Sequence, residues 1–172
     1  VKIGDGSTVA SPIEITAPTQ TTREPPKPAV SVAKGTKLVA WWDAQDEKIR
    51  GATVESQSIG NHFDLDVNPI NNIKPLSIGL AAEGDIVHLV FPQLKGQNFK
   101  LFHAPLDLGA SQPQVGTIKR LTGGSRDSLD PRPGIVDADN DGTSDRLVAV
   151  WRTVEDVGGS ATEHHLAIGT TS

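Results

Sequence analysis

Cysteine is absent from the 172-residue chain. Its absence excludes a disulfide framework, a thiol nucleophile and a zinc site built from thiolates. Methionine and tyrosine are also absent, and only three tryptophans and four phenylalanines are present. We therefore expect a core packed from aliphatic rather than aromatic side chains. Because the first residue is Val1, we expect the sequence to start at an internal point of its gene product.

The chain also lacks long apolar runs and basic blocks. It contains no apolar run of about 18 residues, no heptad pattern and no cluster of lysine and arginine. The formal net charge is -5. The sequence therefore predicts no membrane insertion and no binding to nucleic acid.

Glycine and proline are plentiful, with 17 and 12 copies. Together with many β-branched residues, they indicate short strands joined by turns. No segment shows the apolar period of 3.6 residues that an amphipathic helix needs. The sequence predicts an all-β protein.

Three segments repeat one pattern, in which a strand, a glycine-containing turn and a second strand ending in an aromatic residue follow a proline. They span residues 29–42, 76–91 and 134–151. A third strand is predicted after each hairpin, at 48–54, 100–106 and 165–169. A fourth is predicted at 63–67 and 115–121.

Four short antiparallel strands per repeat is the pattern of a β-propeller blade. We predict a half blade at 1–24, blades at 25–70 and 71–124, and a partial blade at 125–172. About three and a half blades are too few for a ring of roughly four to eight. We therefore expect another protein chain, or a second copy, to complete the propeller. The alternative fold is a β-sandwich with Greek-key connections, which the same strands allow.

The third hairpin contains the segment DADNDGTSD at residues 137–145. Four carboxylates at positions 1, 3, 5 and 9 of this segment, with a glycine where the chain turns, follow the ligand order of a calcium loop. The predicted ligands of a bound Ca²⁺ are Asp137, Asp139, Asp141, the Thr143 carbonyl and Asp145. The alternative is a solvated acidic turn, because Asp, Asn and Gly are common turn residues. Turn propensity does not account for four carboxylates at this spacing, so we predict calcium binding.

Residues 133–151 resemble the FG-GAP type calcium repeat of integrin-like and bacterial surface β-propellers, where DxDxDGxxD lies in a hairpin followed by an apolar strand. The segment LVAWWD with IRGA, at 38–43 and 49–52, resembles blades of extracellular bacterial propellers. The resemblance implies the same five calcium ligands and a structural ion that supports one blade. It also implies an extracellular or cell-envelope location, where calcium reaches the millimolar levels that weak loops require.

Two histidine-containing segments are weaker candidates. His62, Asp64 and Asp66 alternate, so all three would project from one face of a strand. We interpret them as the solvated face of that strand rather than as a metal site. His164 and His165 are adjacent, so their rings would point to opposite faces and could not bind one ion together.

No catalytic or cofactor-binding motif is present, and no residue is predicted to be catalytic. Three functions remain open. The first is a non-catalytic, calcium-stabilised module for binding or assembly. The second is the propeller portion of a multichain secreted enzyme or electron-transfer assembly. The third is a carbohydrate-binding propeller, in which one tryptophan of Trp41 and Trp42 faces the core and the other is available to a sugar ring.

Residues 126–132 form a mixed-charge loop. We interpret it as a surface network whose charges satisfy one another.

Overall fold

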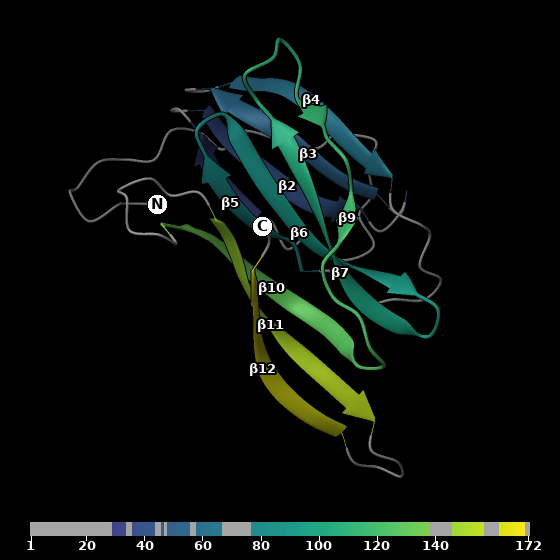
Figure 1. Ribbon diagram of the computed structural model, residues 1–172. Helices are drawn as coiled ribbons and strands as arrows, with labels where there is room; N and C mark the ends of the chain where they lie inside the picture. Colours follow the sequence, from purple (N-terminus) through teal and green to yellow (C-terminus); the bar gives the residue numbers. More distant parts are fainter. Residues whose placement is uncertain are drawn as a thin grey trace, which may run out of the picture.

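The computed structural model describes residues 29–33, 36–43, 46, 48–55, 58–66, 77–137, 146–156 and 162–170. Every regular element within these ranges is a β-strand, which confirms the predicted all-β class. No helix able to cross a membrane occurs among them. The strands form three antiparallel sheets (Figure 1).

The first sheet is a four-stranded meander in the order β1-β2-β3-β4. Its strands are β1 (Ala29–Ala33), β2 (Thr36–Asp43), β3 (Lys48–Glu55) and β4 (Ser58–Asp66). In β4, Phe63 and Leu65 are buried whereas His62 and Asp64 are exposed. This alternation confirms that the histidine and aspartate belong to the solvated face.

The second sheet contains β5 (Gly79–Glu83), β6 (Ile86–Lys95), β7 (Asn98–Asp107), β8 (Gln114–Val115) and β9 (Lys119–Arg120). The predicted turn between its first two strands is present, and Gly84 adopts a φ of 56° there. The fourth strand predicted at 115–121 is split into β8 and β9, which both pair with β7. The split lies opposite Pro105, which has no N–H to donate to a continuous neighbour.

The third sheet contains β10 (Asp127–Val136), β11 (Arg146–Asp156) and β12 (Thr162–Thr170), in that order. β10 starts well before the predicted Gly134, so the segment 127–132 is strand and the prediction of a loop there was wrong. Prolines 131 and 133 are tolerated because β10 is an edge strand with a register shift between Leu129 and Arg132.

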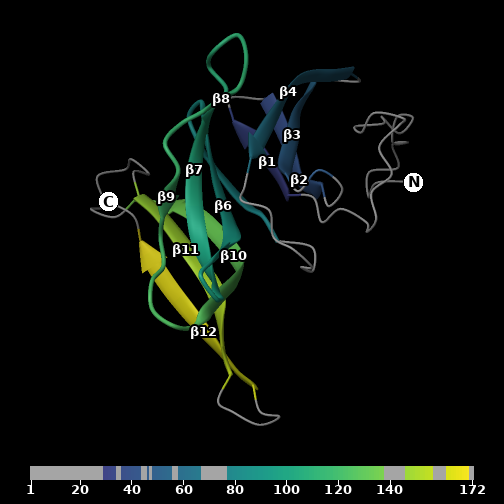
Figure 2. The same ribbon diagram turned by 90° about the vertical axis from the view of Figure 1, so that its right-hand side faces the viewer.

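The second sheet lies between the other two (Figure 2). One of its faces packs Leu89 and Phe91 against the first sheet, in a core that includes Ile49. The opposite face packs Val90 and neighbouring residues against Leu147 of the third sheet. Burial on both faces explains why β6 is an almost continuous apolar run rather than a strict alternation.

The expectation that one residue of the Trp41–Trp42 pair is available to a ligand was wrong. Trp41 is 4% exposed and Trp42 is 6% exposed. β2 is an inner strand of the first sheet, between β1 and β3, and it is covered on both faces at this point. Neither ring can stack on a sugar.

Three stacked antiparallel sheets fit both a set of propeller blades and an extended sandwich. The described strands do not close into a ring or barrel. The half blade predicted at 1–24 lies outside the described residues. The division of the chain into blades therefore stays a prediction.

Candidate functional site

The predicted calcium loop joins two paired strands of the third sheet. Val136 at the end of β10 lies opposite Arg146 at the start of β11, so the two ends of segment 137–145 are neighbours across the sheet. Asp137 directly follows β10 and is half-buried. The other predicted ligands, Asp139, Asp141, Thr143 and Asp145, lie outside the described residues.

Within the described part of the chain, no three histidine, aspartate or glutamate side chains are grouped in a way that could hold a metal ion. Asp64 instead forms ion pairs with Lys48 at 3.8 Å and Arg50 at 3.6 Å. A metal site that uses His62 and Asp64 has no third described ligand beside it.

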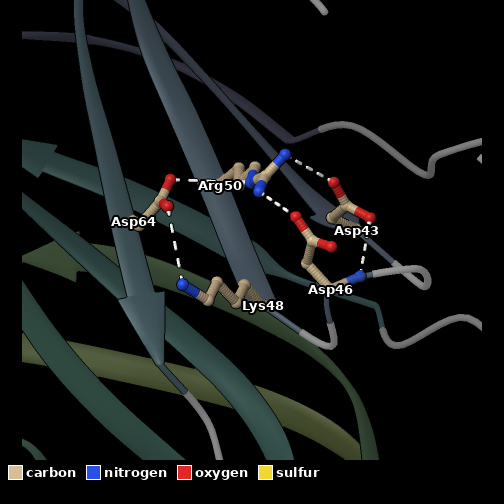
Figure 3. A network of polar contacts seen from close by, with 5 residues as sticks. All are labelled: Asp43, Asp46, Lys48, Arg50 and Asp64. Carbon is tan, nitrogen blue, oxygen red and sulfur yellow. Dashed lines mark hydrogen bonds and ion pairs between the residues drawn. The ribbon is translucent and has the colours of Figure 1, made fainter. Parts of the chain in front are cut away.

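Arg50 is the centre of a five-residue network at the end of the first sheet where β2 passes to β3 (Figure 3). Its Nη1 lies 2.8 Å from the buried carboxylate of Asp43. Its Nη2 donates to Asp46, and its Nε faces Asp64. The backbone N–H of Asp46 also donates to Asp43, at 3.2 Å. One guanidinium thus connects the turn to two strands of the sheet.

The charges of this network stabilise one another. Burial acts to lower the pKa of Arg50, but the hydrogen bond to Asp43 and the charges of Asp43, Asp64 and Asp46 outweigh it and raise that pKa. A permanently charged arginine surrounded by carboxylates offers neither a general base nor a nucleophile. We interpret the network as structural, because it stabilises the hairpin formed by β2 and β3.

A second polar network joins the second and third sheets. Asp127 accepts hydrogen bonds from the backbone N–H of Phe99 at 2.8 Å and from the side chain of Asn98. Asp130 accepts from Ser77 and, through one oxygen, from both Nε and Nη2 of Arg152. These partners of both aspartates lie outside 126–132. That the charges within this segment satisfy one another stays a prediction.

His88 of β6 and His103 of β7 form a hydrogen-bonded pair, with 2.9 Å between Nδ1 and Nε2. Only one of the two nitrogens can carry the shared proton, so the pair is suited to the neutral state. Burial, the charge of His88 and the charge of Lys119 lower the pKa of His103 to about 4. Burial also lowers the pKa of His88, against the opposing effect of Glu83.

We expect this pair to make the protein sensitive to acid. The pKa of His103 is about 4 in the folded protein and 6.5 ordinarily, so the unfolded chain binds more protons between these pH values. As far as His103 is concerned, the free energy of unfolding should be highest above pH 6.5 and should decrease as the pH drops towards 4. We expect a loss of about 2 kcal/mol for this half-buried group. Urea unfolding at several pH values should show a flatter profile for His103→Asn than for the wild-type chain, and equally steep profiles would contradict a role of His103.

An open cleft of about 470 Å³ lies where the segment after β9 faces β11. Trp151 and Thr153 of β11 form one wall, and Gly123, Gly124 and Arg126 belong to the other. The indole nitrogen of Trp151 and the hydroxyl of Thr153 are buried and have no hydrogen-bond partner among the described residues. The cleft therefore combines an aromatic side chain with polar atoms that have no described partner.

The sequence does not predict this cleft. It predicts Trp151 only as the aromatic end of a strand, and Gly123 and Gly124 precede the loop predicted at 126–132. The alternation of Trp151 and Thr153 does place both on one face of β11. The sequence contains no signal that a segment about 30 residues earlier would face them, because that contact depends on how two sheets pack.

Comparison with known proteins adds no relative. The chain matches no protein family, no curated protein and no solved structure. The resemblance to the FG-GAP repeat stays a prediction.

Proposed function

We propose that this chain is a calcium-stabilised β-propeller segment that serves as a non-catalytic binding and assembly module of a larger extracellular or cell-envelope protein. The observation that carries the proposal is the register of the third hairpin. Val136 opposes Arg146, so the two ends of a carboxylate-rich segment are held at adjacent strands, and carboxylates at this spacing can surround one cation.

The arrangement of the sheets supports a propeller. Each sheet is built from strands that are consecutive in the chain, and consecutive sheets pack face to face around apolar cores. Each sheet thus behaves as one repeat that contacts its neighbour, as in propellers and other repeat proteins.

The third sheet supports the assembly role. It has three described strands, whereas each of the other two has strands in a fourth position. Among the described strands, β12 pairs with β11 alone, and an open edge of this kind accepts a further strand. A second chain that supplies this strand would complete the blade.

Removal of calcium is expected to destabilise the protein. At calcium concentrations of 10 to 100 times a millimolar-range Kd, binding to the native state stabilises it by about 2 kcal/mol, or roughly 5 °C in Tm. Thermal unfolding should therefore move to lower temperature in EDTA and return with excess calcium. Asp139→Ala should abolish the difference, because it removes one of the carboxylate ligands.

Asn140→Ala is the matched control, because it changes the same loop at a position that supplies no predicted ligand. It should keep the response to EDTA. A melting curve that ignores the chelator in the wild-type chain would contradict calcium binding. Native mass spectrometry of the same samples addresses assembly, since a stable lone monomer would contradict completion by another chain.

A further inference from the structure

The cleft between the segment after β9 and β11 has the lining of a saccharide site. Trp151 contributes an aromatic ring to the lining, and Thr153 and Ser128 contribute hydroxyl-bearing side chains. The Thr153 hydroxyl and the Ser128 side chain are buried without a ligand. Its volume of about 470 Å³ lies within the roughly 300–1,000 Å³ of small-molecule sites. An aromatic ring beside several hydrogen-bonding groups suits a ligand with an apolar face and a hydroxylated rim.

Trp151 is the suitable tryptophan of this chain. Trp41 and Trp42 are buried in the first sheet, whereas Trp151 is partly exposed at the cleft. Its indole N–H is a buried donor with no acceptor in the part of the chain that the structure describes. An unsatisfied donor costs free energy, and a ligand oxygen that reached it after a small movement of the ring would recover that cost.

The surroundings of the cleft are cationic, although the whole chain carries a net charge of -5. Arg126 lines the cleft. The ammonium group of Lys100 donates a hydrogen bond to the backbone carbonyl of Arg126. Arg120 lies near enough to help burial lower the pKa of Lys100, while Asp127 acts in the opposite direction. Among these described residues, three cationic side chains stand against the single carboxylate of Asp127, and this charge favours an anionic ligand.

We propose that this cleft binds an acidic saccharide, with the sugar ring against Trp151 and its carboxylate towards Arg126. The proposal deepens the proposed function, because it gives the binding module a ligand class. It does not depend on the calcium loop, so the two can fail separately. A peptide with a free carboxyl terminus carries the same negative charge as an acidic saccharide. Unlike the saccharide, it does not need a flat aromatic ring and several hydroxyl partners.

The test is a titration of the ¹⁵N-labelled full chain with galacturonic acid, followed by NMR at constant pH and ionic strength. The chain has three tryptophans, so the indole region contains three N–H signals, and Trp151→Phe assigns the relevant one. We expect that signal to shift with saturation at a Kd of about 1 mM. Arg126→Gln should weaken binding about ten-fold, as expected for loss of a charge-assisted hydrogen bond. Arg132→Gln is the matched control, because Arg132 is exposed on β10 and does not line the cleft; it should leave the Kd unchanged.

Galactose, acetate and a peptide with a free carboxyl terminus separate the alternatives. Galactose should bind more weakly than galacturonic acid, and acetate and the peptide should not saturate the Trp151 signal in the same range. Equal binding of galactose would overturn the role of charge, and equal binding of acetate or the peptide would overturn a saccharide ligand. No shift with galacturonic acid would overturn the site. The proposed saccharide site does not involve the calcium loop. The same titration in EDTA should therefore give the same Kd, whether or not the chain binds calcium.

Discussion

Replacement of Gly79 by alanine is expected to lower the free energy of unfolding by about 3 kcal/mol. A Cβ atom at this buried position would lie 2.2 Å from Cδ of Pro133 and 2.7 Å from the carbonyl oxygen of Pro131. These atoms belong to a backbone segment and a proline ring of β10, so neither can rotate away. The second and third sheets would have to separate locally, which weakens the core between them. Urea unfolding of the variant and the wild-type chain measures the difference.

Gly134→Ala is the matched control on the facing strand. Gly134 also lies in β10, but no atom of the described residues lies within 4 Å of a Cβ atom built there. Its replacement should leave the stability unchanged or raise it by a few tenths of a kcal/mol, because alanine restricts the unfolded chain. Equal losses in both variants would contradict the close approach of β5 to β10. A stable Gly79→Ala variant would contradict it as well.

The strands were predictable because their signals are local. Alternation of apolar and polar residues in β4 gives the buried Phe63 and Leu65 directly. The Glu-Gly turn between β5 and β6 follows from the conformational freedom of Gly84, which adopts a positive φ there. A two-residue alternation and a four-residue turn can both be predicted from the local sequence, without information about residues that are distant in the chain.

The errors arise where distant segments meet. Alternation predicts one buried and one available residue for Trp41 and Trp42, yet both are buried because β2 is covered on both faces. The sequence predicts that the third hairpin begins after a proline, at Gly134, yet β10 extends across Pro131 and Pro133 because an edge strand does not need every N–H. Both outcomes depend on the position of a strand within its sheet, which the local sequence does not contain.

The candidate sites divide in the same way. Ligand spacing within one loop is a property of the sequence, so the calcium loop could be predicted from residues 137–145 alone, and the structure adds the pairing of Val136 with Arg146. The cleft at Trp151 draws its walls from two segments that only sheet packing brings together. No spacing rule could have identified it.

Replacement of Asp43 by alanine is expected to lower the free energy of unfolding by about 3 kcal/mol. The Asp43 side chain is only 2% exposed, and its carboxylate lies 2.8 Å from Nη1 of Arg50. Its loss would leave a largely buried guanidinium with weaker partners and would also remove the acceptor of the Asp46 N–H. Thermal or urea unfolding measures the change, and Asp43→Asn separates the two effects, since asparagine keeps the acceptor for Asp46 and loses the charge.

Lys48→Ala is the comparison that identifies burial as the cause. Lys48 lies 3.8 Å from Asp64, and both side chains are substantially exposed, at 34% and 50%. Water and salt screen such a pair, so its loss should change stability by no more than about 0.5 kcal/mol. If Asp43→Ala lowers the free energy of unfolding no more than Lys48→Ala does, the buried ion pair does not stabilise the hairpin. If Asp43→Asn is as damaging as Asp43→Ala, the charge accounts for the effect. If Asp43→Asn is close to wild type, the hydrogen bond that closes the turn accounts for it instead.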